Sequence, residues 1–138
     1  MTYLVFKYGT MNSSKSANLL MTAHTMHKQG KKVILIKPSA DTRDGVDIIT
    51  SRVGLKALAD IILLPNNNPI DTNFPSNVDI VLVDEAQFLT VNNVERLRTI
   101  ASTFHIPIIC YGLLTDYRSK LFSGSQRLVE LADSLKEI

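Results

Sequence analysis

Four continuous apolar runs, rich in β-branched residues, recur along the chain, and each has the length of a strand. They are YLVFKY (3–8), VILIKP (33–38), DIVLVD (79–84) and PIICYG (107–112). Their apolar positions do not alternate with polar ones, which is typical of parallel strands covered by helices on both faces. The pattern therefore predicts a mainly parallel sheet in the interior of the molecule.

Segments with a helical spacing of apolar residues lie between and after these runs. The first, 14–32, contains Gly30 followed by two lysines, which predicts the end of a helix. The second, 93–104, places Val94, Leu97, Ala101 and Phe104 on one face. The third, 125–138, does the same with Leu128, Leu131 and Leu135. Alternation of strands and helices predicts an α/β three-layer domain with right-handed crossovers.

The middle of the chain is less regular. The segment DIITSRVGLKALADIILL (47–64) predicts one or two short extra strands. The segment PNNNPIDTNFPSN (65–77) is rich in Pro and Asn, which is typical of a loop.

Composition is that of an ordinary globular protein, with 45% apolar and 20% charged residues, and 138 residues favour one domain spanning 1–138. The formal net charge of +2 is too small to indicate a nucleic-acid or membrane partner. Cys110 is a single cysteine, so no disulfide can form within the chain, which favours a reducing compartment. Without a leader pattern or a membrane-spanning apolar stretch, we expect a cytoplasmic protein.

The segment GTMNSSKS (9–16) follows the first predicted strand and precedes the first predicted helix. Its fit to G-x-x-x-x-G-K-[ST] indicates a phosphate-binding loop, whose backbone N–H groups surround phosphate oxygens. Lys15 would reach the β- and γ-phosphates, and the hydroxyl of Ser16 would bind Mg²⁺. The residues expected to bind ATP are Gly9, Thr10, Met11, Asn12, Ser13, Ser14, Lys15 and Ser16.

Ser14 departs from this pattern, which has Gly at that position. Gly accepts a positive φ without a Cβ penalty and lets the backbone approach a ligand closely, so Ser14 is expected to strain or narrow the loop. A cost on the order of 1 kcal/mol would weaken nucleotide binding without abolishing it. The alternative interpretation is that NSSKS (12–16) is only a serine-rich cap at the start of a helix.

Two acids end the third apolar run, in IVLVDEAQF (80–88). The end of a central strand lies at the carboxyl edge of the sheet, where open α/β sheets bind their ligands. Asp84 fits the Asp that holds Mg²⁺ in P-loop proteins, and Glu85 could be a general base. The pair does not distinguish an attacking water from an attacking hydroxyl, and a strand-end turn with two solvated acids is the alternative.

Five segments together resemble the thymidine kinases of bacteria, pox-like viruses and animal cytosol: GTMNSSKSANLL, KPSADTRDG, SRVGL, DEAQFL and YGLLTDYRSKLFSGSQRLVELAD. The segments DEAQF and YGL…DYR…F are the specific ones, because generic P-loop ATPases do not share them. The resemblance covers nearly the whole chain. It implies a three-layer P-loop NTPase (RecA-like) domain and ATP-dependent phosphorylation of thymidine in pyrimidine salvage.

The resemblance also implies residue roles. Lys15 and Ser16 would serve the ATP phosphates and Mg²⁺, with Asp84 as the other metal ligand and Glu85 as the base acting on the 5′-hydroxyl. Asp41 and Arg43 would lie near the transferred phosphoryl group, and Arg52 would add positive charge there. The pocket for the nucleobase would be lined by Met11, Phe88, Leu113, Tyr117 and Phe122, for which plain core packing is the alternative.

The chain departs from the family pattern at several points. Leu114 stands where Asp is common, and Tyr117 where Phe is common. The zinc-bound segment of the family, which is built from Cys pairs, would follow near Ile138, and Cys110 alone cannot assemble such a site. We therefore expect no zinc here and a chain that is cut short, a naturally short form being the alternative. Members of the family are usually tetramers, which implies a homo-oligomer.

Two other functions remain open from the residues alone. A P-loop ATPase in which Glu85 activates water needs only residues 9–16, Asp84 and Glu85. A nucleotide-binding remnant without catalysis is motivated by Ser14 and the missing segment.

Overall fold

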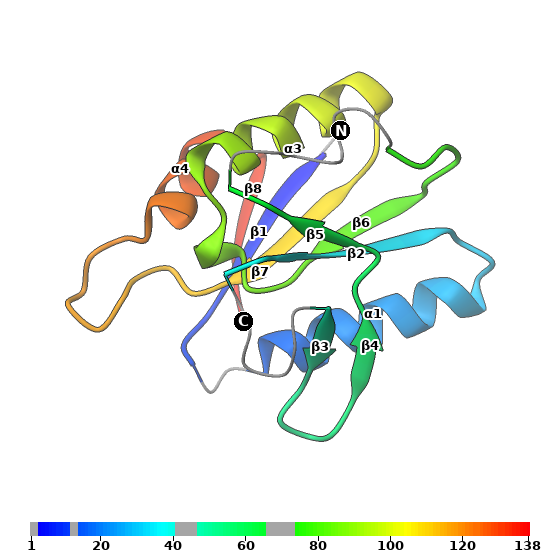
Figure 1. Ribbon diagram of the computed structural model, residues 1–138, viewed down its shortest axis with the longest axis horizontal. Helices are drawn as coiled ribbons and strands as arrows, with labels where there is room; N and C mark the ends of the chain where they lie inside the picture. The colour runs from blue at the N-terminus through cyan, green and yellow to red at the C-terminus, as the bar shows by residue number, and fades with distance from the viewer. Residues whose placement is uncertain (1–2, 12–13, 41–46, 66–73) are drawn as a thin grey trace.

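The computed structural model describes residues 3–11, 14–40, 47–65 and 74–138, and a six-stranded sheet forms its centre (Figure 1). The strands lie in the order β5–β2–β6–β7–β1–β8, and all neighbouring pairs are parallel. They are β1 (Leu4–Tyr8), β2 (Val33–Pro38), β5 (Ile61–Leu63), β6 (Ile80–Val83), β7 (Ile108–Gly112) and β8 (Ser134–Glu137). The four apolar runs are thus confirmed as strands β1, β2, β6 and β7.

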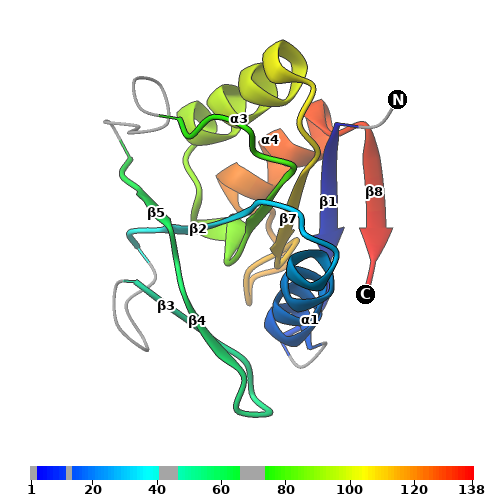
Figure 2. The same ribbon diagram turned by 90° about the vertical axis from the view of Figure 1, so that its right-hand side faces the viewer.

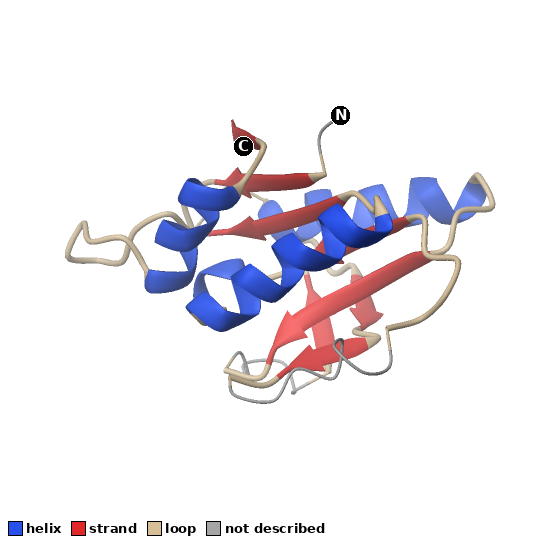
Figure 3. Ribbon diagram, turned by 90° about the horizontal axis from the view of Figure 1, so that it is seen from above, coloured by secondary structure: helices blue, strands red, loops and turns tan. Residues whose placement is uncertain are grey.

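Helices cover both faces of the sheet. Helix α1 (Lys15–Lys28) lies on one face, and α3 (Val91–Phe104) and α4 (Ser123–Leu131) lie on the other (Figures 2 and 3). Along β2, Leu35 packs in the cluster that contains α1 residues, and Ile36 packs in the cluster that contains α3 residues. This arrangement confirms the three-layer α/β fold. Among the described residues, no helix combines the length and the apolar character needed to cross a membrane.

The helix expected in 14–32 ends as its sequence predicts, because α1 stops at Lys28 and Gly30 has a φ of 77°. On α3, the expected apolar face is buried at Val94, Leu97 and Ala101. Phe104 is the exception: it lies in the last turn and is 57% exposed. Its ring stacks on Phe74 with the centroids 6.1 Å apart.

The helix predicted over 125–138 is wrong in its second half. Helix α4 ends at Leu131, and the chain then forms β8 beside β1, with Leu135 paired to Phe6. Asp133, between α4 and β8, holds the chain at the start of β1, since its carboxylate accepts hydrogen bonds from the backbone N–H groups of Tyr3 and Leu4. Burial also differs from the expectation, because Leu135 is 46% exposed. The open edge of β1 therefore prevails over the helical spacing of the leucines.

The segment 47–64 forms three strands instead of one or two. Strands β3 (Ile48–Thr50) and β4 (Lys56–Leu58) make an antiparallel hairpin outside the central sheet, whereas β5 joins that sheet beside β2. The turn of the hairpin is held by Ser51, whose Oγ accepts from the backbone N–H of Leu55 at 3.0 Å. Lys37, which is 1% exposed, donates from its Nζ to the carbonyl of Ile48. The hairpin is thereby attached to the end of β2.

Candidate active site

The phosphate-loop sequence lies between β1 and α1, as its pattern requires. Gly9 donates its backbone N–H to the carbonyl of Gly112 at 3.3 Å, which joins the start of the loop to the end of β7. Lys15 opens α1, and its Nζ donates to the carbonyl of Thr10. The side chain of Lys15 thus lies back along its own loop. Asn12 and Ser13 lie outside the described residues.

Ser14 has the conformation that its place in the pattern demands of Gly. Its φ is 62° and its ψ is 34°, in the left-handed region that costs an L-residue about 1 kcal/mol or more. Although Ser14 is the residue before α1, its side chain accepts no capping hydrogen bond in the described structure. Interpretation of this serine as a helix cap is therefore not supported, and its backbone geometry is that of a loop glycine.

Ser16 and Asp84 meet across the gap between α1 and β6. The Oγ of Ser16 lies 3.2 Å from Oδ1 and 3.1 Å from Oδ2 of Asp84, whose side chain is nearly fully buried. A hydroxyl and a carboxylate at this separation are oxygen ligands of the kind that Mg²⁺ uses, with water and substrate phosphates completing its shell. Among the described residues, no group of three or more His, Cys, Asp and Glu side chains is placed to hold a metal ion.

Glu85 follows Asp84 in a second left-handed conformation, with a φ of 50° and a ψ of 44°. Such values are uncommon outside Gly, Asn and Asp, and they cluster at functional sites. Glu85 precedes the short 3₁₀ helix η1 (Ala86–Phe88), where the backbone N–H of Phe88 donates to the carbonyl of Glu85 at 3.0 Å. Its carboxylate accepts a hydrogen bond from Nε2 of Gln87. The turn thus presents two adjacent acids with different partners.

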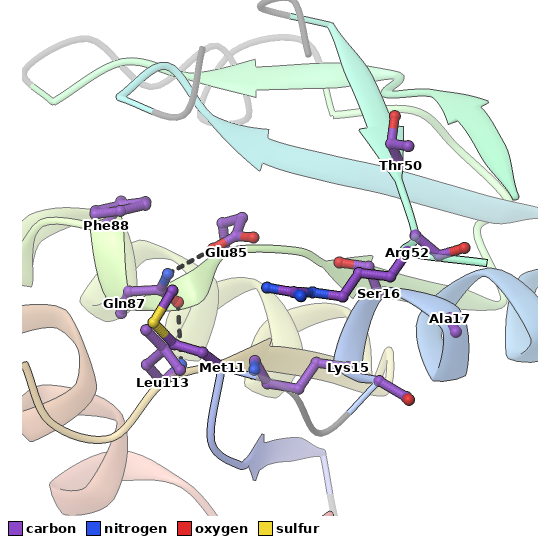
Figure 4. A pocket seen from close by; sticks show the side chains of 12 residues that line it. Met11, Lys15, Ser16, Ala17, Thr50, Arg52, Glu85, Gln87, Phe88 and Leu113 are labelled. Carbon is purple, nitrogen blue, oxygen red and sulfur yellow. Dashed lines mark hydrogen bonds between the residues drawn. The ribbon is translucent and has the colours of Figure 1, made fainter. Parts of the chain in front are cut away.

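Lys15, Ser16 and Glu85 line a cleft of about 490 Å³ at the carboxyl edge of the sheet (Figure 4). Three walls enclose it, and Arg52 extends into it from the hairpin. One wall comes from the phosphate loop and α1, one from the hairpin, and one from the ends of β6 and β7. The lining residues are Met11, Ser14, Lys15, Ser16 and Ala17, then Thr50, Ser51 and Arg52, and finally Glu85, Gln87, Phe88 and Leu113.

The residues expected around a nucleobase are only partly brought together. Met11, Phe88 and Leu113 line the cleft. Phe122 packs edge-on against Phe88, with ring centroids 6.1 Å apart, and so supports that wall from behind. Tyr117 is not among the lining residues: it is 94% exposed, and the guanidinium of Arg118 lies 5.7 Å from its ring centroid. Asp41 and Arg43, expected near the phosphoryl group, lie outside the described residues.

Sequence reasoning missed Ala17, Thr50, Ser51 and Gln87 as lining residues. The hairpin residues could have been suspected, because Ser51 stands beside Arg52 in the segment SRVGL and Thr50 directly precedes that segment. Gln87 gives a weaker signal, namely a polar residue between Ala86 and Phe88. Cys110 is buried as expected of a small hydrophobe, and burial raises the pKa of its thiol to about 12, so it has no thiolate to offer the site.

Comparison with known proteins adds an independent finding. A family model for thymidine kinase matches residues 2–138. The thymidine kinase of Enterobacteria phage T4 is 40% identical over 145 residues, covering 100% of this chain and 73% of the phage protein. That of Lactococcus lactis is 41% identical over 140 residues, covering 100% of this chain and 74% of its own length. That of Encephalitozoon cuniculi is 42% identical over 135 residues, covering 98% of this chain and 64% of its own length.

Proposed function

Because the chain belongs to the thymidine kinase family, we propose that it transfers the γ-phosphoryl group of ATP to the 5′-hydroxyl of thymidine. One observation carries the proposal: Ser16 and Asp84 are in contact, and Glu85, the residue next to Asp84, shares a cleft with Lys15. The site thus brings together a cation at Lys15, two oxygen ligands at Ser16 and Asp84, and the carboxylate of Glu85. ATPase activity with water as the acceptor is not favoured, since the relatives are named thymidine kinases.

The reaction needs positioning and charge stabilisation more than covalent chemistry. The 5′-oxygen attacks the γ-phosphorus, the bond from that phosphorus to the β–γ bridging oxygen breaks, and the hydroxyl proton passes to Glu85. Lys15 binds the phosphate oxygens, and Arg52 adds positive charge from the opposite wall. Arg43 has the same role by resemblance alone. Mg²⁺, held through Ser16 and Asp84, would neutralise charge on the phosphates when bound.

The nucleoside is proposed to bind against Met11, Phe88 and Leu113, because an aromatic face beside aliphatic side chains suits a pyrimidine ring. Phe122 supports this wall through its contact with Phe88. Tyr117 stays a prediction of the resemblance. We further propose that residues 1–138 are one nucleotide-binding domain, that the protein acts in the cytoplasm, and that it assembles as a homo-oligomer, a tetramer by resemblance.

Phosphorylation of thymidine by the purified chain, with Mg²⁺ and ATP, tests the proposal. Formation of thymidine monophosphate and ADP in equal amounts is expected, with other nucleosides as controls. Glu85→Gln keeps the size of the side chain but removes the base, so kcat should fall about 10²- to 10⁴-fold. ATP hydrolysis that needs no nucleoside and yields no nucleotide product would contradict the proposal.

A further inference from the structure

Gln87 is a polar side chain of the cleft whose contacts have no part in the roles given above. Only 4% of it is exposed, and a buried primary amide must have its donors and its acceptor hydrogen-bonded. Its Nε2 donates to Oε2 of Glu85, and its Oε1 accepts from the backbone N–H of Leu113 at 3.1 Å (Figure 4). One amide group thus joins the carboxylate of Glu85 to the chain that follows β7.

Glycine at position 112 makes room for this amide. A Cβ there would lie 2.7 Å from Oε1 of Gln87 and 2.9 Å from its backbone N, distances that real Cβ atoms do not adopt. The carbonyl of Gly112 accepts from Gly9, so the same residue also holds the first residue of the phosphate loop. The position of the Gln87 side chain is therefore set by the close approach of the backbone at Gly112 to the backbone of η1, and not by side-chain packing alone.

The peptide groups of Leu113 provide a fixed reference point on the cleft wall. Its N–H is bound by Gln87, and its carbonyl accepts from the Oγ of Ser125, a fully buried side chain in α4. The side chain of Leu113 lines the cleft. A group tied to this peptide is consequently tied to the wall against which the nucleoside is proposed to bind.

Glu85 benefits from such a tie because its side chain has several rotatable bonds. The left-handed backbone of Glu85 sets the direction in which the side chain leaves the turn, but not where its carboxylate comes to rest. A donor amide bound to Oε2 restricts this freedom before substrate arrives. Preorganisation of this kind is effective in catalysis, since a misplacement of about 1 Å can cost about 100-fold in rate.

We propose that Gln87 is a positioning residue that holds the carboxylate of Glu85 at a fixed place relative to the nucleoside wall at Leu113. This inference rests on the proposed function, because it concerns the base of that reaction. It deepens that function by naming the group that aims the base. It also assigns a reason to Gly112, whose lack of a side chain lets the amide reach both partners.

Two substitutions separate the contacts of Gln87. Gln87→Glu keeps an oxygen that can accept from Leu113 but loses the donor to Glu85, whereas Gln87→Met is similar in size and keeps neither. In both, kcat for thymidine phosphorylation should fall about 10- to 100-fold, and KM for ATP should stay within about twofold. Gly112→Ala, which displaces the amide, should give a similar loss. Gln126→Met replaces an exposed glutamine on α4 and is the matched control, with kcat unchanged.

A double-mutant cycle with Glu85→Gln distinguishes positioning from a general structural effect. If Gln87 acts through Glu85, adding Gln87→Met to Glu85→Gln should change the residual kcat by less than about threefold. Wild-type kcat in Gln87→Met, or an equal loss in both backgrounds, would overturn the inference. Failure of the proposed function is a different result, namely no thymidine monophosphate from the unaltered chain. Thermal unfolding of Gln87→Glu and Gln87→Met identifies a variant that does not fold, and the other then decides.

Discussion

Replacing Gly124 with Ala sets two effects of opposite sign against each other. Gly124 lies in the first turn of α4, where Ala favours the helix over Gly by up to about 1 kcal/mol. A Cβ at this position, however, would lie 2.3 Å from the carbonyl oxygen of Leu89 and 3.1 Å from that of Ala86. Both neighbours are backbone atoms, so the chain around η1 would have to move to accept the methyl group.

The steric effect should prevail. Overpacking of a buried position costs about 1 to 3 kcal/mol, and an approach to backbone as close as 2.3 Å puts Gly124 at the upper end of this range. After the gain in helix propensity is subtracted, Gly124→Ala should lower the free energy of unfolding by about 2 kcal/mol. For a denaturant slope of about 2 kcal/mol/M, the urea midpoint falls by about 1 M.

Urea unfolding followed by far-ultraviolet circular dichroism measures this shift. Gln126→Ala, an exposed change in the same helix, is the control and should move the midpoint by less than about 0.3 M. An unchanged or raised midpoint in Gly124→Ala would refute the reasoning, because helix propensity would then outweigh the contact with Leu89. Since η1 begins directly after Glu85, we expect kcat to fall as well.

Two further predictions concern stability. Thr90 caps α3 by accepting a hydrogen bond from the backbone N–H of Asn93, whereas the side chain of Ser14 makes no capping hydrogen bond in the described structure. Thr90→Ala should therefore lower the free energy of unfolding by about 1 kcal/mol, and Ser14→Ala by less than about 0.5 kcal/mol. Equal losses in urea unfolding would contradict this difference. Hydrogen bonds from the backbone and from Arg98 lower the pKa of Asp133 from 3.8 to about 2, so its stabilisation is complete above about pH 4 and is lost as the pH falls towards 2. Because 35% of the Asp133 side chain is exposed, this stabilisation amounts to only about 1 kcal/mol. Asp133→Asn should flatten the dependence of the urea midpoint on pH over this range. An unaltered slope would contradict the prediction.

The central strands could be predicted because each is a continuous apolar run between helical segments. Such a run can be recognised without knowing which distant residues it contacts. Strand β8 could not be predicted in the same way. Leu128, Leu131 and Leu135 satisfy a helical spacing, and it is the pairing of residues 134–137 with residues 5–8 of β1, far away in the sequence, that makes a strand of 134–137. The local pattern of apolar residues was therefore sufficient to predict the buried central strands, but not the strand at the edge of the sheet.

The site shows the same division. The meeting of Ser16 with Asp84 follows from two motifs at the carboxyl edge of one sheet, so it was accessible from the sequence. The position of the Gln87 side chain could not be predicted from the sequence, because it depends on how closely β7 approaches η1 at Gly112. Tyr117 shows where motif position is not enough: its ring is 94% exposed and is not among the residues that line the cleft, so its place near the base stays a prediction.

Strand β8 also has a practical consequence for measurement. Because β8 runs parallel to β1, it carries the chain to the same edge of the sheet as the phosphate loop, and Ile138 donates its backbone N–H to the carbonyl of Tyr8 at 2.8 Å. Tyr8 directly precedes Gly9. A fluorophore or spin label attached at Ile138 would thus sit near the start of the phosphate loop, where we expect it to report ligand binding without any change to the residues that line the cleft.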